Sequence, residues 1–401
     1  MRVQDLEKKK ILILGFGREG KDTLLFLRKK FPKKSIGIAD QKQGKDYLKK
    51  IKNYDVIIKS PGVPNSVVSP FLTKKQKVTS QTELFFDECP GMIVGVTGTK
   101  GKSTTASLIY AVLKSGGVRA HLLGNIGEPA LSYLAKAKPE DVFIYELSSF
   151  QLENLKQSPH ISVLLNVYPE HLDHHQSFAK YARAKANIAK HQTAENFLIY
   201  NTENKIAADI AKLSKAQKIP FKGGFGSKEP AILVGKLFGI SDAKIQRAIK
   251  AFKPLEHRLE KIGKWKGVTF YNDSLATIPQ ATMGALDTLG PKVHTLIAGG
   301  YDRGISYDVL GKRISESNVQ LLILFPTTGE KIFKALTKPT EYLTLESMKE
   351  AVKQAFLRTP KGKICLLSPA SSSFNMFKDY KDRGEQFKKW VQYYGKGKKT
   401  A

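Results

Sequence analysis

The chain has 401 residues, more than a single hydrophobic core usually supports, so we expect two or three domains. Hydrophobic residues make up 41% of it, which argues against intrinsic disorder. No apolar run is long enough to cross a membrane. The two cysteines, Cys89 and Cys365, are far apart and lack metal-ligand spacing, as expected for a cytoplasmic, reducing compartment.

The formal net charge of +30 has two interpretations. A basic protein can bind nucleic acid through its phosphates, or it can simply have a solvated, lysine-rich surface. The lysines are spread along the chain, and no basic motif interleaved with aromatic residues is present. We favour the surface interpretation and expect no nucleic-acid partner. Salt-dependent retention on DNA would contradict this interpretation.

Residues 11–90 alternate short apolar runs with a helical stretch. We expect strands at 11–15, 35–40 and 55–62, and a helix at 22–31. This order is typical of βαβ units, in which a crossover helix joins parallel strands. The first region is therefore predicted to be an α/β domain with a parallel sheet.

The same pattern recurs twice further along the chain. Strands are expected at 92–98, 141–149, 161–167, 197–201, 267–273, 294–300, 321–325 and 363–369. Helices are expected at 103–115 and around 177–191, the first closed by two glycines. We place the domain boundaries near residues 90 and 256, which gives domains at 1–90, 91–256 and 257–401.

A glycine-rich turn follows the strand at 92–98 and leads directly into a helix. It contains Gly98, Thr99, Lys100, Gly101, Lys102, Ser103 and Thr104. Glycines let backbone N–H groups approach phosphate oxygens, and the helix N-terminus adds a positive dipole end. The Lys102 side chain is expected to reach the β- and γ-phosphates, and the hydroxyl of Ser103 or Thr104 to bind magnesium. An ordinary turn is the alternative, but strand, turn, GKST and helix together favour an ATP loop.

Acidic and imidazole side chains follow the next strands. Glu146 lies at the carboxyl end of a strand, where open α/β sheets bind ligands, and its carboxylate suits magnesium. Three histidines, at 171, 174 and 175, also fit zinc, although their spacing is not a usual zinc signature. We take Glu146 as a candidate magnesium ligand and expect His174 and His175 in a solvated loop.

Five segments together resemble the Mur ligases, most closely the D-glutamate-adding branch. They are GTKGKST at 98–104, GNIG at 124–127, ELSSFQLE at 146–153, NVYPEHLD with YARAK at 166–185, and LSPASSSFNMFKDYKDRG at 367–384. The resemblance implies a Rossmann-like N-terminal domain, a central P-loop ATPase-like domain and a Rossmann-like C-terminal α/β domain. It also implies a monomeric cytoplasmic ligase that uses ATP and Mg²⁺ to add D-glutamate to UDP-N-acetylmuramoyl-L-alanine through an acyl phosphate.

The resemblance also implies roles for individual residues. The catalytic set would be Lys102, Glu146, His171, Lys185 and Arg258. Magnesium would be held by Ser103, Glu146, His171 and a carbamylated Lys185, since a carbamate turns a cation into an oxygen ligand. The UDP-sugar would be bound by Gly17, Asp40, Ser60, Pro61, Gly62 and Asn125.

In the third region the resemblance is carried by HRLE at 257–260, NDS at 272–274 and GGYDRG at 299–304. It implies that Arg258 and Asp273 lie near the nucleotide. It further implies that the acceptor amino acid is bound by Arg303, Ser373, Phe374 and Tyr380. Arg303 stands where the family has lysine, and Leu275 stands where the D-glutamate branch commonly has lysine, so another amino-acid acceptor is an alternative.

Two alternatives belong to other classes of protein. Residues 15–20, GFGREG, follow a strand and precede a helix, and Asp40 lies about twenty residues further on, which is the fingerprint of an NAD-dependent dehydrogenase. A basic nucleic-acid-binding P-loop ATPase would also use the turn at 98–104. The dehydrogenase interpretation leaves the segments at 98–104, 146–153 and 367–384 unused. The nucleic-acid interpretation lacks a basic binding groove.

Overall fold

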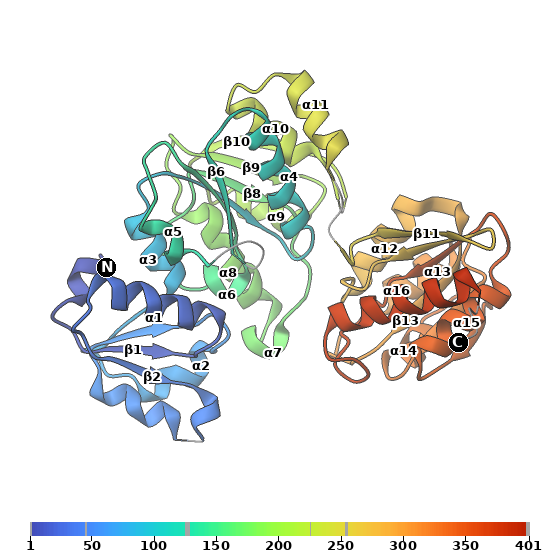
Figure 1. The fold of residues 1–401 in the computed structure, drawn as a ribbon, viewed down its shortest axis with the longest axis horizontal. Helices are drawn as coiled ribbons and strands as arrows, with labels where there is room; N and C mark the ends of the chain where they lie inside the picture. The colour runs from blue at the N-terminus through green and yellow to red at the C-terminus, as the bar shows by residue number, and fades with distance from the viewer. Residues whose placement is uncertain (1, 45, 125–128, 225, 253–255, 398–401) are drawn as a thin grey trace. The chain divides into compact units, whose positions relative to one another are not determined.

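The computed structural model describes residues 2–44, 46–124, 129–224, 226–252 and 256–397. The chain forms two compact units, 1–252 and 253–401. Each unit is built of helices packed on sheets of mainly parallel strands (Figure 1), which confirms the predicted α/β class.

The first sheet of unit 1 has the order β2-β1-β3-β4, and all its pairs are parallel. Its strands are β1 (Ile11–Leu14), β2 (Ile36–Ala39), β3 (Val56–Lys59) and β4 (Lys77–Thr79). Its α-helices are α1 (Arg18–Lys30), α2 (Asn65–Val68) and α3 (Gln81–Glu88), and its 3-10 helices are η1 (Val3–Leu6), η2 (Gln41–Gln43), η3 (Tyr47–Asn53) and η4 (Ser69–Phe71).

The second sheet of unit 1 has the order β10-β9-β8-β5-β7-β6 and is also parallel. Its strands are β5 (Met92–Thr97), β6 (Ala120–Gly124), β7 (Val142–Glu146), β8 (Ile161–Leu164), β9 (Phe197–Asn201) and β10 (Gln217–Phe221). Its helices are α4 (Lys102–Ser115), α5 (Leu131–Leu134), α6 (Ser149–Leu152), α7 (Leu172–His175), α8 (Phe178–Lys190), α9 (Lys205–Ala211), α10 (Glu229–Leu237) and α11 (Asp242–Ala251).

The two sheets of unit 1 share one apolar core. Buried residues of β1 and β3 belong to the same cluster as Phe85 of α3 and Tyr145 of β7. The Phe85 ring meets the Tyr145 ring edge-on at 5.5 Å, a favoured aromatic geometry. This packing fixes the carboxyl ends of the first sheet beside those of the second.

Unit 2 contains one six-stranded sheet of order β11-β12-β16-β13-β14-β15, in which only β11 and β12 pair antiparallel. Its strands are β11 (Glu260–Trp265), β12 (Val268–Asn272), β13 (Val293–Gly299), β14 (Leu321–Phe325), β15 (Glu341–Thr344) and β16 (Ile364–Leu367). Its helices are α12 (Pro279–Leu289), η5 (Gly290–Lys292), α13 (Asp308–Ser315), α14 (Thr328–Lys334), α15 (Met348–Arg358) and α16 (Tyr380–Lys396).

Candidate functional site

A cavity of about 780 Å³ lies in unit 1 where the two sheets present their carboxyl ends. Its lining combines loops after β1, β2 and β3 with loops after β7 and β8 and with side chains of α4 and α8. Ligands of parallel α/β sheets bind at this edge. The cavity therefore brings the glycine motif at 15–20 together with Lys102 of the turn at 98–104.

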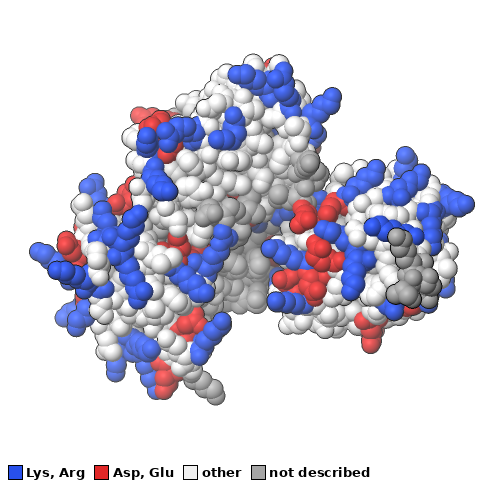
Figure 2. Space-filling view, in the orientation of Figure 1, with Lys and Arg blue, Asp and Glu red and all other residues white. Residues whose placement is uncertain are grey.

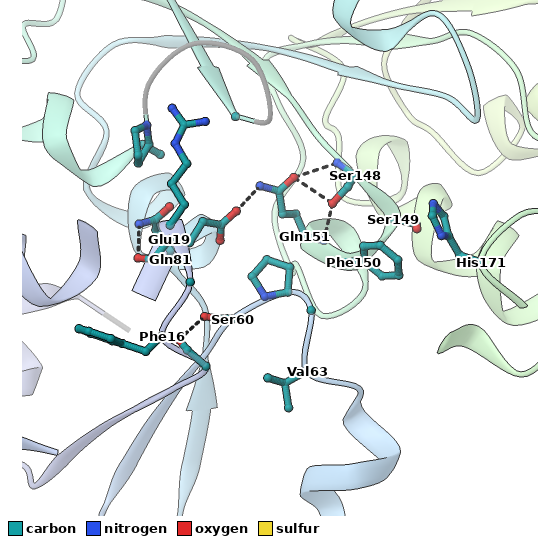
Figure 3. Close-up of a pocket in the computed structure, with 18 of the residues that line it drawn as sticks. Phe16, Glu19, Ser60, Val63, Gln81, Ser148, Ser149, Phe150, Gln151 and His171 are labelled. Atoms are coloured by element: carbon teal, nitrogen blue, oxygen red, sulfur yellow. Dashed lines mark hydrogen bonds between the residues drawn. The ribbon is translucent and has the colours of Figure 1, made fainter. Parts of the chain in front are cut away.

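Five of the six residues expected at the UDP-sugar line this cavity: Gly17, Asp40, Ser60, Pro61 and Gly62. The sixth, Asn125, lies outside the described residues. The Asp40 carboxylate accepts hydrogen bonds from the backbone amides of Lys42 and Phe16, and these bonds hold its pKa below the usual range. The Ser60 hydroxyl donates to Gly15 O at 2.7 Å, joining the loops after β1 and β3 (Figure 3).

Glu19 and Gln151 link the two sides of the cavity; both lie inside quoted motifs, but neither was predicted to be a site residue. Gln151 Nε2 donates to Glu19 Oε1 at 2.8 Å, and Gln151 Oε1 accepts from the amide of Ser148 at 2.9 Å (Figure 3). The other Glu19 oxygen, Oε2, is buried and accepts no hydrogen bond from the described residues. Burial raises the pKa of the Glu19 carboxyl to about 7, because the charged form loses its hydration there.

We expect Glu19→Gln to remove a pH dependence of stability. Between the ordinary carboxyl pKa and about 7, folded Glu19 holds a proton that the unfolded chain has released, so stability falls as the pH rises through that window. The neutral variant should lack this loss and exceed wild type above neutral pH by up to about 3 kcal/mol. Urea unfolding at several pH values measures it, with the exposed Glu195→Gln as control. Identical pH slopes in Glu19→Gln and wild type would contradict the assignment.

The turn between β5 and α4 is held in shape by the segment that follows β8. Gly101 adopts φ 89°, a left-handed conformation that favours glycine, just before the first turn of α4. The amide of Thr99 donates to Asn166 O at 2.7 Å, and the amide of Lys100 donates to Asn166 Oδ1 at 3.0 Å. The Thr99 hydroxyl contacts the Tyr181 hydroxyl at 3.0 Å. Asn166 and Tyr181 thus support the loop, a role that was not predicted for either residue.

Two lysines converge on the carbonyl groups of this turn. Lys102 Nζ donates to Gly98 O and Thr99 O, each at 3.0 Å, and Lys185 Nζ donates to Gly98 O at 2.8 Å. Lys185 is 2% exposed, so it is not the helix-surface lysine that its position alone would suggest. Burial, reinforced by the charge of Lys102, lowers the pKa of Lys185 well below its ordinary value.

Glu170 is a further buried charge beside the loop, and its carboxylate pairs with Lys100 Nζ at 2.8 Å. Burial alone would raise the pKa of Glu170, but Lys100, His171 and Lys102 outweigh it and bring the pKa to about 2. Glu170 therefore stays ionised near neutral pH. Lys100 was expected at the nucleotide, and its ammonium group forms this ion pair.

Glu146 has the properties of a metal ligand. It pairs with Val96 of β5 at the carboxyl end of β7, and its side chain is 2% exposed. Its Oε2 makes no hydrogen bond with the described residues, and its charge acts on Lys185. A buried carboxylate oxygen without a hydrogen bond is costly unless a cation satisfies it, so this site fits a divalent cation.

The three histidines after β8 lie in different surroundings. His171 lines the cavity with its Nε2 3.7 Å from Glu170 Oε2, and its backbone is left-handed at φ 56°. The expectation of a solvated loop for His174 and His175 was wrong: the His175 side chain is 0% exposed and that of His174 9%. The Phe150 ring packs against both, at 5.4 Å from His175 and 4.4 Å from His174, and so excludes water.

In unit 2, Asp273 follows β12 and anchors neighbouring loops. Its carboxylate accepts hydrogen bonds from Ser368 Oγ at 2.8 Å and from the amide of Leu259 at 3.1 Å. Arg383, 0% exposed, donates to Ser274 Oγ at 3.0 Å and to Ser371 O at 3.0 Å. This network ties the NDS segment to the LSPA segment, two motifs about a hundred residues apart in sequence.

All four residues expected at the acceptor belong to unit 2. The guanidinium of Arg303 lies 5.7 Å from the centroid of the exposed Phe374 ring, and Ser373 is buried next to Phe374 in the chain. Tyr380 begins α16, and its carbonyl accepts a hydrogen bond from Ser274 Oγ at 2.7 Å. Arg258 belongs to the same unit, beside the buried His257.

On the face that Figure 2 draws, the positive charge does not gather in a stripe. On the face drawn in Figure 2, lysine and arginine side chains are scattered over both units with acidic groups between them. Among the helices of the described residues, none combines the length and apolar character needed to cross a bilayer.

Comparison with known families matches both units. The family model of the Mur ligase middle domain matches residues 96–263, and that of the Mur ligase glutamate ligase domain matches residues 257–371. Together with the fold and the glycine-rich loop, these matches define an ATP-dependent acid–amino-acid ligase.

Relatives agree with this class, and solved structures share the fold. The chain is 36% identical to the UDP-N-acetylmuramoylalanine–D-glutamate ligase of Acetivibrio thermocellus, over 87% of this chain and 84% of that one. It is 32% identical to the enzyme of the same name from Koribacter versatilis, over 97% and 98%. The MurF ligase of Thermotoga maritima, solved with ADP, superposes with a TM-score of 0.62 at 16% identity, covering 98% and 97%. The pseudomurein peptide ligase type C of Methanothermus fervidus gives a TM-score of 0.58 at 17% identity, covering 95% and 100%.

The chain belongs to the Mur ligase family. This membership decides against the dehydrogenase and the nucleic-acid ATPase alternatives.

Proposed function

We propose that this protein uses ATP to add D-glutamate to UDP-N-acetylmuramoyl-L-alanine through an acyl-phosphate intermediate. Relatives named for this reaction are 32% and 36% identical to the chain over most of its length, and that observation carries the proposal. The reaction belongs to peptidoglycan precursor synthesis, and through it to cell wall biogenesis, cell shape and cell division. We further propose that the enzyme works in the cytoplasm as a monomer.

The three sheets are assigned to three functional domains. Residues 1–90 form a Rossmann-like domain that binds the UDP-sugar through Gly17, Asp40, Ser60, Pro61 and Gly62, with Asn125 contributed by the next domain. Residues 91–256 form a P-loop ATPase-like domain, and residues 257–401 form a Rossmann-like domain for the amino acid. The assignment is supported by the cavity at the carboxyl ends of the first two sheets.

ATP binds on the turn formed by Gly98, Thr99, Lys100, Gly101, Lys102, Ser103 and Thr104. The substrate carboxylate attacks the γ-phosphorus, the bond to the β,γ-bridging oxygen breaks, and ADP leaves. The Lys102 ammonium stabilises the negative charge on the transferring phosphoryl oxygens. The amine of the acceptor then attacks the acyl carbon, and inorganic phosphate leaves.

Ser103, Glu146, His171 and Lys185 would hold Mg²⁺, which would neutralise phosphate charge during the transfer. The buried Oε2 of Glu146 supports this assignment. Lys185 serves there as its carbamate. Burial and the charge of Lys102 lower the pKa of Lys185, which favours the uncharged amine that reacts with carbon dioxide, and the carbamate replaces a buried cation beside the metal with an oxygen ligand.

We assign the acceptor amino acid to Arg303, Ser373, Phe374 and Tyr380 of unit 2, and we assign Arg258 and Asp273 of the same unit to the nucleotide. A planar guanidinium binds a carboxylate through two parallel hydrogen bonds, so Arg303 suits an acidic acceptor. The Phe374 ring under Arg303 supports that guanidinium from one side. Leu275 offers no charge, so we assign recognition of the acceptor carboxylate to Arg303 rather than to the NDS segment.

The proposal is tested by phosphate release with ATP, Mg²⁺, UDP-N-acetylmuramoyl-L-alanine and a panel of D- and L-amino acids. We expect turnover to require the sugar nucleotide and to be fastest with D-glutamate. Preference for a different amino acid would overturn the acceptor while leaving the ligase class intact. Turnover that needs no sugar nucleotide would overturn both substrates.

A further inference from the structure

Three side chains outside the proposed catalytic set converge at the ends of two short helices. Glu153 directly follows α6, and His174 and His175 are the last residues of α7. His174 Nε2 lies 3.6 Å from Glu153 Oε2, and His175 Nδ1 lies 3.7 Å from Glu153 Oε1. One ligand atom from each residue lies within 4.8 Å of the other two.

These separations are longer than hydrogen bonds and suit a shared metal ion. Two donors at about 2.0–2.1 Å from a tetrahedral zinc ion are about 3.3–3.4 Å apart, so side-chain shifts from the present limit of 4.8 Å would bring one ligand atom of each residue onto one ion. Two imidazoles and one carboxylate form a ligand set that zinc uses in proteins.

The cluster is largely buried, and two of its polar atoms lack a hydrogen bond of normal length. The His175 side chain is 0% exposed, that of His174 9% and that of Glu153 22%. Within the described ranges, His174 Nε2 and Glu153 Oε2 are buried and make no hydrogen bond of 3.5 Å or less, since their contact with each other is 3.6 Å long. Burying such polar atoms costs free energy unless a partner satisfies them, and a cation between them would do so.

Neighbouring residues already orient one imidazole as a metal ligand. His175 Nε2 is 3.0 Å from Ser149 Oγ, which leaves Nδ1 directed toward Glu153. A hydrogen bond to the far nitrogen is the usual way in which proteins fix the tautomer of a metal-bound histidine. Phe150 stacks on the His175 ring with an interplanar angle of 3°, which holds that ring in place.

We propose that Glu153, His174 and His175 bind a divalent transition metal ion, zinc foremost, at a site separate from the magnesium site. The two nitrogen ligands select zinc over magnesium, which prefers oxygen. Lys59, a buried lysine whose Nζ donates to Val63 O, also acts on the Glu153 carboxylate. Its charge weakens cation binding at this site.

The metal would affect the catalytic cavity by holding in place two segments that line it. Helices α6 and α7 have four residues each, too short to be stable without tertiary support. Phe150 and Gln151 of α6 line the cavity, as does His171 at the start of α7. An ion joining Glu153 to His174 and His175 would tie these two segments together.

The test is a zinc titration of the full-length protein, first stripped with a chelator and kept in excess Mg²⁺ without nucleotide. Calorimetry should find one zinc ion bound per chain, and zinc should raise the melting temperature. Glu153→Gln and His174→Arg should each weaken zinc binding at least tenfold and abolish the rise in melting temperature. The arginine introduced by His174→Arg can still pair with Glu153, so this variant should keep the fold. If His174→Arg does not fold, the zinc affinity of Glu153→Gln tests the proposal.

Glu146→Gln, in the proposed magnesium site, is the matched control and should bind zinc as wild type does. Three outcomes would overturn the proposal: no zinc bound by wild type, unchanged zinc affinity in Glu153→Gln, or loss of zinc in Glu146→Gln with retention in His174→Arg. None of them depends on ligase activity, so the proposed function stands or falls separately.

Discussion

Lys102→Ala should lower kcat by about 10²–10³-fold or more and should weaken ATP binding. The Lys102 ammonium is held 3.0 Å from two carbonyl oxygens of the glycine-rich turn, at the start of α4. A transferring phosphoryl group spreads negative charge over its oxygens, and a fixed cation stabilises that charge more in the transition state than in bound ATP. Steady-state kinetics and calorimetric titration with a non-hydrolysable ATP analogue measure the two effects.

The matched control for Lys102→Ala is Lys114→Ala, which removes an exposed lysine from the last turn of the same helix. It should change neither kcat nor nucleotide affinity, since surface substitutions away from a site have small effects. If Lys102→Ala retained kcat within twofold of wild type, the turn at 98–104 would not be the site of phosphoryl transfer.

Lys185→Ala should lose activity by about 10²-fold or more, and added bicarbonate should not restore it. The wild-type enzyme, by contrast, should lose activity after removal of carbon dioxide and recover it with bicarbonate. The reason is that Lys185 is 2% exposed with a strongly lowered pKa, so its uncharged amine can form the carbamate that binds magnesium. Turnover at controlled bicarbonate concentrations measures both effects.

Lys190→Ala controls for this substitution because Lys190 is an exposed lysine at the end of the same helix, α8. It should respond to bicarbonate as wild type does. Wild-type activity independent of carbon dioxide would rule out the carbamate, and near-normal activity of Lys185→Ala would remove this residue from the site altogether.

The interior strands of all three sheets could be predicted from the sequence, because strands covered on both faces are continuous apolar runs. Those at 11–14, 92–97, 197–201 and 321–325 are examples. The strands that the sequence did not reveal are β4, β6, β10, β11 and β15, and all of them lie at sheet edges. Edge strands are short and polar: β4 reads KVT and β15 reads EYLT, so their pattern does not differ from that of a loop.

The candidate site was predictable where a motif combines glycines, a lysine and a helix start. It was not predictable where burial decides the chemistry. Glu170 and Tyr181 lay inside the family motifs, yet their contacts with Lys100 and Thr99 depend on how β8 and α8 pack beside the loop. The same holds for His174 and His175, which become buried because Phe150 comes from a segment about 25 residues away.

The central claim is that ATP activates the carboxylate of the sugar nucleotide as an acyl phosphate. Its most direct test uses UDP-N-acetylmuramoyl-L-alanine labelled with ¹⁸O in the alanine carboxylate, and mass spectrometry of the inorganic phosphate released during turnover with D-glutamate. We predict that each phosphate carries one oxygen from the labelled carboxylate. Phosphate free of ¹⁸O, with product formed at the normal rate, would contradict the mechanism.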